Sequence, residues 1–207
     1  SIFTDNKSSD GGGISNYYGT TVVANSTFAN NTAGDGGGIY NRYFLIVTNS
    51  TFSGNSASSS IGGVYSVYSG YASLKNSIIA NNIGGNCSEV YAYNRNLSTD
   101  DTCLGAIEAT SADINLGPLA DNGGPTKSLA LLPESIAIDE GNNDICAAAI
   151  GVPNYGADGV DQRGVTRPHD GLCDIGAFEG EPGVATFSDV PSNHWAYTYI
   201  ERLYNAG

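Results

Sequence analysis

Positive charge is scarce in this sequence. It has 8 Lys plus Arg against 21 Asp plus Glu, a formal net charge of −13, which argues against nucleic acid or an anionic membrane as a partner. No segment approaches the ~20 consecutive apolar residues that cross a bilayer, so no membrane span is expected. Methionine is absent and no signal peptide is visible. We therefore expect the chain to be a processed portion of a longer protein.

What the sequence does contain is a repeat. The phrase Asp-Gly-Gly-Gly-Ile ends at Ile14 and again at Ile39, and Gly-Gly-Val ends at Val64, so the period is 25 residues. A period in this range is typical of a solenoid, in which each coil buries its apolar face only against its neighbours. Leucine-rich repeats have a similar period, but they need recurrent Leu, which is rare here.

Two further apolar columns define the shape of each coil. They consist of Val23, Val47 and Leu74, and of Phe28, Phe52 and Ile79. Side chains alternate along a strand, so residues five apart point to opposite faces unless the chain turns a corner between them. Within one coil, the residue from the first column and the residue from the second are both apolar, and an Asn-Ser dipeptide lies between them. Three short strands per coil predict an all-β fold, a right-handed parallel β-helix.

Asparagine recurs at two positions of the repeat. Stacked Asn side chains can hydrogen-bond their amides from coil to coil at the ~4.8 Å strand spacing, which forms a ladder. We predict one ladder at the corner between two strands and a second one a few residues later. The corner ladder comprises Asn25, Asn49 and Asn76, and the second comprises Asn31, Asn55 and Asn82, with Asn6 ahead of it.

The chain divides into three parts by pattern. Residues 1–85 hold coils of about 25 residues, residues 86–180 hold the last coils and an irregular cap module, and residues 181–207 hold a linker and a segment of different character. Residues 86–107 leave the repeat. Charged side chains in the cap module are expected to form ion pairs that seal the last coil. They are Asp161, Arg163, Arg167, Asp174 and Glu179.

Four cysteines, Cys87, Cys103, Cys146 and Cys173, allow three disulfide pairings. We favour Cys87–Cys103 and Cys146–Cys173, because each pair closes a modest loop and the pairs do not cross. A zinc site is the rival, but no Cys-x-x-Cys occurs and the chain has only 2 His. Disulfides indicate export.

The cap module also suggests a Ca²⁺ site, because oxygen-rich loops suit that ion. The candidate ligands are Asp158, Asp161, Asp170 and Asp174. Their spacing does not match an EF-hand, and we favour structural turns as the role of these residues. Apart from this possible Ca²⁺, no cofactor is expected.

Two motifs of the module carry a specific resemblance. Asp-Gln-Arg-Gly occupies 161–164 and Asp-Ile-Gly-Ala-Phe-Glu occupies 174–179. With the Gly-Gly-Gly-Ile and Asn-Ser-Thr-Phe-Ser-Gly-Asn coils, they resemble bacterial surface β-helix proteins called choice-of-anchor Q domain proteins. The coils also resemble the repeats of polymorphic outer-membrane proteins. The resemblance covers about residues 1–180 and implies an exported protein tethered at the cell surface. It implies no catalytic residue.

The last segment resembles the opening of an S-layer homology motif, whose modules hold exported proteins to cell-wall polysaccharide. The resemblance rests on Phe187-Ser188-Asp189-Val190-Pro191 and on Trp195 in the stretch that follows. A short C-terminal helix is predicted, with one apolar face formed by Trp195, Tyr199, Ile200 and Leu203. The second half of the motif is missing. We therefore expect this segment to bind wall polysaccharide only when the motif is completed elsewhere.

Tyrosine is the most abundant aromatic residue, with 13 Tyr against 6 Phe and 1 Trp. Aromatic rows can stack on sugar rings or on another protein, and they can equally cover loops of their own coil. The predicted glycan or partner contacts are Tyr17, Tyr18, Tyr40, Tyr43, Tyr65, Tyr68 and Trp195.

The sequence predicts a non-enzymatic, secreted structural protein of the cell surface or wall. It would be an adhesin, a sheath or the subunit of an extracellular filament, self-associating into a homopolymer through its coil edges. The alternative is a polysaccharide-binding or polysaccharide-cleaving, lyase-like protein. Cleavage needs a placed carboxylate pair or a base beside bound Ca²⁺. Since Lys7, Arg42 and Lys75 are the only cations of the coils and none adjoins an acidic cluster, we expect no catalytic residues.

Overall fold

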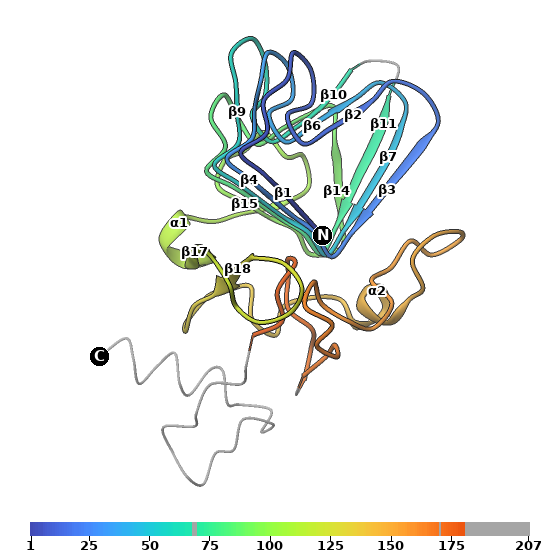
Figure 1. The fold of residues 1–207 in the computed structure, drawn as a ribbon. Helices are drawn as coiled ribbons and strands as arrows, with labels where there is room; N and C mark the ends of the chain where they lie inside the picture. The colour runs from blue at the N-terminus through green and yellow to red at the C-terminus, as the bar shows by residue number, and fades with distance from the viewer. Residues whose placement is uncertain (68–69, 170, 181–207) are drawn as a thin grey trace, which may run out of the picture.

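The structure is a computed structural model that describes residues 1–67, 70–169 and 171–180. Its N-terminal part is a β-helix of three parallel sheets, seen nearly along its axis in Figure 1. The coils turn clockwise as they recede from the N-terminus, so the β-helix is right-handed. The all-β, parallel β-helix predicted from the repeat is therefore confirmed.

Each sheet collects one strand from every coil. Sheet I contains β1 (Ile2–Thr4), β4 (Thr27–Ala29), β8 (Thr51–Ser53), β12 (Ile78–Ala80), β15 (Leu97–Ser98) and β16 (Ile107–Glu108). Sheet II contains β2 (Ile14–Asn16), β6 (Ile39–Asn41), β10 (Val64–Ser66) and β13 (Cys87–Ser88). Sheet III contains β3 (Thr20–Ala24), β7 (Phe44–Thr48), β11 (Tyr71–Lys75) and β14 (Tyr91–Tyr93). A small pair, β5 (Thr32–Ala33) and β9 (Ser56–Ala57), links two of the outer loops.

The interior of the β-helix consists of three stacked apolar columns. The strand registers align Val23–Val47–Leu74, Phe28–Phe52–Ile79 and Ile14–Ile39–Val64. The rings of Phe3, Phe28 and Phe52 stack with centroids 4.6 and 4.4 Å apart. Glycine is needed at 38, because a Cβ there would lie 2.7 Å from the Gly63 carbonyl oxygen and 3.0 Å from Phe52 Cδ1. The columns predicted from the repeat are thus the core.

One of the two predicted asparagine columns forms a ladder. The Nδ2 of each member donates to the Oδ1 of the next, from Asn6 to Asn31 at 2.9 Å, from Asn31 to Asn55 at 2.8 Å and from Asn55 to Asn82 at 2.9 Å. The backbone amides of Asn31 and Asn55 donate to the same oxygens, at 3.1 and 3.0 Å. A last rung runs from Asn82 to Asn86 at 2.9 Å.

Asn25, Asn49 and Asn76 do not form the predicted corner ladder. Their φ angles are +47°, +44° and +47°, the left-handed conformation that Asn tolerates better than most non-glycine residues. Their Nδ2 groups donate to residues between 142 and 173 and not to one another. The serine that follows each Asn makes the contact between coils instead, for example from the Ser26 amide to Ser50 Oγ at 3.2 Å.

The repeat continues beyond the point where its sequence pattern ends. Residues 86–107 were expected to leave the coils, but β13, β14 and β15 pair in parallel with the third coil. Residues 99–106 then cover the end of this shorter coil. Cys103 packs into the interior cluster, and the Leu104 carbonyl accepts a hydrogen bond from the Ala92 amide at 3.0 Å. The Cys87–Cys103 disulfide ties this closing segment to β13.

Residues 109–169 and 171–180 form what we call the lateral module, which packs alongside the coils. It contains α1 (Ser111–Ile114), α2 (Asn143–Ala147) and the antiparallel pair β17 (Leu116–Ala120) and β18 (Ser128–Leu131). It lies below the corner between sheets I and III (Figure 1). Three successive coils bind it through their corner asparagines, whose acceptors are the Ala157 carbonyl, Cys146 Sγ and the Asn142 carbonyl. Residues 99–106, and not this charged module, therefore close the last coil.

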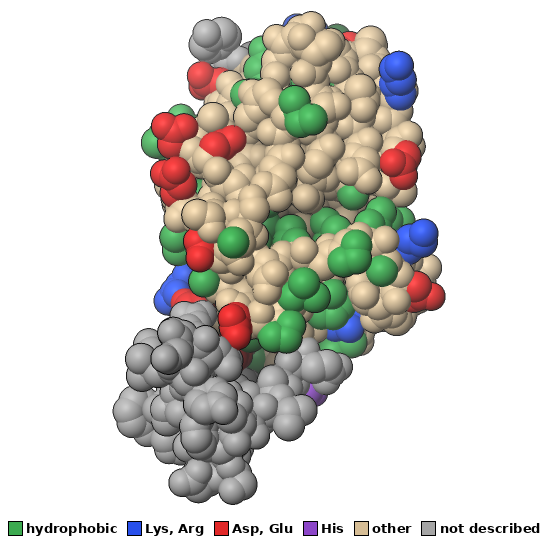
Figure 2. Space-filling model, turned by 90° about the vertical axis from the view of Figure 1, so that its left-hand side faces the viewer, with side chains coloured by type: hydrophobic (Ala, Val, Ile, Leu, Met, Phe, Trp, Pro, Cys, Tyr) green, Lys and Arg blue, Asp and Glu red, His purple; other side chains and the backbone are tan. Residues whose placement is uncertain are grey.

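A second apolar cluster joins the lateral module to sheet I. In β12, Ile79 packs in the interior of the coils, while Ile78 and Ala80 pack in the second cluster, and all three are at most 1% exposed. Ile175 and Phe178 meet them from the module. Gly176 allows this close approach, since a Cβ there would lie 2.8 Å from Ile78 Cδ1. Figure 2 shows the hydrophobic side chains of this face gathered over the module, below coils with a mostly polar surface.

Four of the five charged residues predicted to form ion pairs do so inside the lateral module, and the carboxylate of the fifth, Asp174, accepts backbone amides instead. Asp161 accepts a hydrogen bond from Arg163 Nε at 2.8 Å. Buried Arg167 places Nη1 3.5 Å from Glu179 Oε2 and donates to the Asp174 carbonyl at 2.8 Å. Burial, together with the negative charge of Glu179, raises the pKa of Asp174 to about 8, and burial raises the pKa of Glu179 as well. This network holds the module's own loops together.

Both favoured disulfides, Cys87–Cys103 and Cys146–Cys173, are present. The predicted C-terminal helix with Trp195 and the whole of residues 181–207 lie outside the described residues. Among the helices of the described ranges, none has the length and apolar character required to span a bilayer.

Candidate binding surface

Five aromatic side chains form a continuous row on the outer face of sheet III, which we call the aromatic strip. The strip consists of Tyr43, Phe44, Tyr71, Tyr91 and Tyr93. Each of these residues is between 40% and 49% exposed. Neighbouring ring centroids lie 5.4, 5.9, 6.2 and 6.2 Å apart along the row. The exposed apolar surface is therefore contiguous over three successive coils.

Strand alternation and strand register place these rings. In β11, Leu74 fills the interior, so Tyr71, three residues earlier, faces solvent. Phe44 occupies the same position in β7 and pairs directly with Tyr71. The fourth coil is shorter, and its register sets Tyr91 opposite Ser73, two residues further along the strand. The strip therefore crosses sheet III diagonally, from its corner with sheet II toward the lateral module.

The strands that carry the strip are nearly free of charge, although the exposed residues Arg42, Glu89 and Arg95 lie close to strip residues in the sequence. None of the four strands of sheet III contains a carboxylate, although the chain has a net charge of −13. Its one charged side chain, Lys75, pairs with Tyr93 at the module end of the strip. Lys75 Nζ donates to the Asn154 carbonyl at 3.1 Å and lies 5.9 Å from the Tyr155 ring centroid. Partial burial lowers the pKa of Lys75.

A second aromatic column, on the outer face of sheet II, makes contacts with other residues of the protein. The rings of Tyr17, Tyr40 and Tyr65 follow one another at 5.5 and 5.8 Å. The Tyr17 hydroxyl donates to Asp10 at 2.8 Å, a hydrogen bond that raises the pKa of Tyr17. The Arg42 guanidinium lies 5.7 Å from the same ring. These contacts fit the alternative interpretation of the tyrosines, in which they cover loops of their own coil.

The predicted contact residues thus separate into different groups. Of that set, Tyr43 belongs to the aromatic strip, and Tyr17, Tyr40 and Tyr65 belong to the column on sheet II. Tyr18 is 87% exposed and belongs to neither row. Tyr68 and Trp195 lie outside the described residues.

Sequence reasoning did not assign Phe44, Tyr91 and Tyr93 to the surface. The exposure of Phe44 was not recognised because this residue directly precedes a run of buried residues, Leu45 to Thr48. The alternation against Leu45 was the signal that could have identified it. Tyr91 and Tyr93 lie in a region where the repeat was not recognised. Their spacing of two around buried Ala92 is nevertheless the pattern of a strand with one solvated face.

Two of the predicted Ca²⁺ ligands, Asp161 and Asp174, are engaged by backbone amides of the lateral module. Asp161 accepts the Glu179 amide at 3.0 Å, and Asp174 accepts the Asp139 amide at 2.8 Å, so both carboxylates satisfy the module's own backbone. Asp158 is exposed, and Asp170 lies outside the described residues. Across residues 1–67, 70–169 and 171–180, no group of three or more His, Cys, Asp or Glu side chains is arranged to hold a metal ion.

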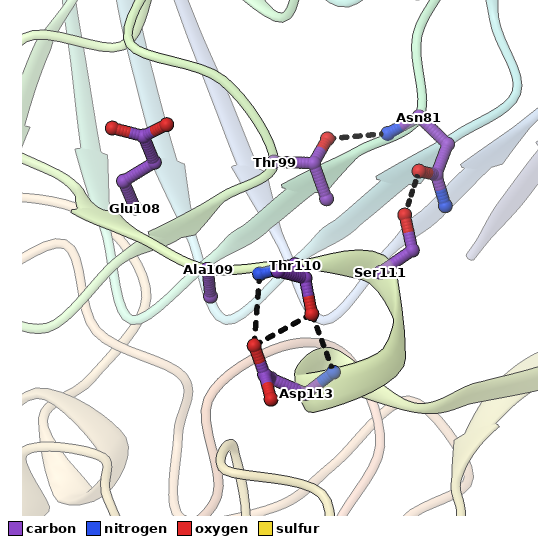
Figure 3. Close-up of a pocket in the computed structure, with 7 residues that line it drawn as sticks. All are labelled: Asn81, Thr99, Glu108, Ala109, Thr110, Ser111 and Asp113. Atoms are coloured by element: carbon purple, nitrogen blue, oxygen red, sulfur yellow. Dashed lines mark hydrogen bonds between the residues drawn. The ribbon is translucent and has the colours of Figure 1, made fainter.

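A shallow polar recess of about 590 Å³ lies between sheet I and α1 (Figure 3). Its lining is Asn81, Thr99, Glu108, Ala109, Thr110, Ser111 and Asp113. Thr110 and Asp113 form the capping box of α1, and hydrogen bonds from Thr110 lower the pKa of Asp113. Ser111 Oγ donates to Asn81 Oδ1. In Figure 3, Glu108 points away from Asp113. The recess therefore holds two carboxylates that do not converge as an acid–base pair needs.

Comparisons with known proteins do not assign this chain to a family. No protein-family model matches the chain, and no curated protein and no solved structure is similar to it. The resemblances to choice-of-anchor Q domain proteins, polymorphic outer-membrane proteins and S-layer homology motifs therefore stay predictions from the sequence. What is established is a parallel β-solenoid with two disulfides and an exposed aromatic strip.

Proposed function

We propose that this chain is a non-enzymatic, exported adhesin, which holds a surface ligand against the aromatic strip. The contiguous row of five half-exposed rings is the observation that carries the proposal. Contiguous exposed apolar surface is typical of interaction sites, and aromatic rings supply large contact areas at a low cost in side-chain entropy. The two disulfides favour an oxidising, extracellular location.

Adhesion fits the molecule better than end-to-end polymerisation. A filament built by stacking coils would place a new strand against each sheet at the end of the last coil. Residues 99–106 cover that end, with Cys103 packed into the interior and joined to Cys87 by a disulfide. Stacking there would require this segment to move. The strip, in contrast, is open along three coils.

Adhesion also fits better than catalysis. The recess beside α1 lacks a convergent carboxylate pair, and the buried acids of the lateral module are bound to backbone amides and arginines. We therefore propose that the chain needs neither a catalytic group nor a cofactor.

The test is retention of the purified chain on a panel of immobilised polymers, which includes neutral polysaccharides, acidic polysaccharides and extracellular proteins. The double variant Tyr71→Ala/Tyr91→Ala removes the centre of the strip, and Tyr18→Ala is the matched control, an exposed tyrosine outside it. We expect retention by at least one polymer, loss of it in the double variant, and no release of sugar or peptide products. Equal retention of the native chain, the double variant and the control variant, or release of sugar or peptide products, would contradict the proposal.

A further inference from the structure

We propose that the ligand of the aromatic strip is an extended neutral polysaccharide with flat, equatorially linked sugar rings. This inference rests on the adhesive role proposed above and specifies its ligand. Three features of the surface lead to it: the shape of the row of rings, the charge of the face on which the rings lie, and the residues at the end of the row.

The shape of the row matches an extended chain. Consecutive ring centroids are 5.4–6.2 Å apart, which is comparable to the length of one sugar residue in an extended polysaccharide. The last two pairs of rings have nearly parallel planes, with interplanar angles of 23° and 13°. Sheet III supports the rings on a rigid, regularly spaced base. A polymer laid along the row can therefore contact several rings at once.

The charge of the face excludes one class of polysaccharide. Recognition of acidic sugars needs cations near the carboxylates of the ligand. The strands of sheet III offer only Lys75, whose Nζ is bound to the Asn154 carbonyl. Of the arginines that lie close to the strip in the sequence, Arg95 is paired with Glu140 and Arg42 lies over the Tyr17 ring. The chain as a whole has a charge of −13 and would repel a polyanion. Equally, the face carries no carboxylate for a basic partner. A neutral polymer is the ligand that meets no electrostatic penalty.

At the end of the strip nearest the lateral module, a loop of the module adds to the surface that a ligand can contact. Beyond Tyr93, the Lys75 side chain bridges from sheet III to the Asn154 carbonyl, and Tyr155 lies beside it. Ile150 and Val152 in the same loop are 51% and 82% exposed. A chain that follows the strip thus reaches this loop after the fifth ring. Lys75 can donate a hydrogen bond to a neutral sugar hydroxyl there.

The experiment is affinity electrophoresis of the native chain in gels that contain either a neutral β-1,4-linked polysaccharide, such as a soluble cellulose derivative or a xylan, or an acidic one, such as polygalacturonate. Titration calorimetry with neutral oligosaccharides of increasing length follows. We expect retardation by the neutral polymers that is insensitive to salt, and affinity that rises up to about five sugar residues, one for each ring.

Single variants locate the contact. Tyr71→Ala and Tyr91→Ala should each weaken binding about 5- to 10-fold, Tyr71→Phe should retain most of it because the ring stays, and Tyr18→Ala should have no effect. Circular dichroism checks that each variant is folded.

The outcomes distinguish this inference from the adhesive role. Strip-dependent binding to acidic polysaccharide only, or to a protein only, would overturn the neutral ligand and leave the adhesive role standing. Binding that ignores the strip variants, or no binding to any polymer, would overturn both.

Discussion

Replacement of Asn55 by Ala tests the asparagine ladder most sharply. The Asn55 side chain is fully buried. Its Oδ1 accepts hydrogen bonds from the amide and the Nδ2 of Asn31, at 3.1 and 2.8 Å. Its Nδ2 donates to the Phe28 carbonyl and to Asn82 Oδ1, at 3.0 and 2.9 Å. The substitution removes all four hydrogen bonds and brings no replacement group.

The loss of stability depends on which hydrogen bonds the partners of Asn55 keep after the substitution. Asn31 Nδ2 still donates to the Phe3 carbonyl, and Asn82 Oδ1 still accepts the amide of residue 55. The Asn31 amide loses the acceptor it has in the ladder, and a stranded buried donor costs about 1–3 kcal/mol. The other three lost hydrogen bonds contribute about 0.5–1 kcal/mol each. We therefore expect the free energy of unfolding to fall by about 2.5–6 kcal/mol.

Urea unfolding followed by far-ultraviolet circular dichroism measures this change, provided that the slope against urea is the same in both proteins. The matched control is Asn6→Ala at the exposed end of the same ladder, where the side chain donates one hydrogen bond to Asn31. The control should lose less than about 1 kcal/mol. Equal losses in the two variants, or a loss below about 1 kcal/mol for Asn55→Ala, would refute the ladder as a major source of stability.

Three further predictions concern the corner asparagine Asn49, the buried carboxylate of Asp174 and the Cys87–Cys103 disulfide. Asn49→Gly and Asn49→Ala both remove the hydrogen bond to Cys146 Sγ, but Asn49→Ala should lower the free energy of unfolding by about 1 kcal/mol more than Asn49→Gly, because φ at 49 is +44°; equal losses would contradict a cost of the left-handed conformation. Because the folded-state pKa of Asp174 is raised from 3.8 to about 8, the folded chain binds more protons between these values, so stability should fall as pH rises, by up to about 1.4 kcal/mol per pH unit. Thermal unfolding from pH 5 to pH 8 should show this fall, flattened in Asp174→Asn, and an unchanged slope would contradict the assignment. Cys87→Ser/Cys103→Ser should lower the free energy of unfolding by about 3 kcal/mol, and an unaltered urea midpoint would show that the closing segment 99–106 is held without the disulfide.

Much of the β-helix could be predicted, because its stabilising contacts are between equivalent residues of successive coils. A column such as Phe28–Phe52–Ile79 appears in the sequence at the same period as in space. The ladder through Asn31 and Asn55 is visible for the same reason. The disulfide pairings followed from short loop closures, which depend on sequence separation alone.

The rest depends on contacts between segments far apart in the sequence. The amide of Asn25 bonds to the carbonyl of Ala157, and no periodicity connects these two residues. The corner asparagines looked like a ladder because their spacing matched one. Their left-handed φ angles, which send the side chains to the lateral module, do not show in the spacing. In the fourth coil the loops shorten, so Tyr91 falls out of the period although its strand pairs in register.

The most direct test of the aromatic strip as a ligand-binding surface is a nuclear magnetic resonance titration of the native chain with a neutral β-1,4-linked oligosaccharide. The adhesive role with a neutral ligand predicts shifts of the ring signals of Phe44, Tyr71, Tyr91 and Tyr93 that saturate together, with Tyr18 unaffected. Shifts confined to the recess around Glu108 and Asp113, or no saturable shift of the strip rings, would contradict it.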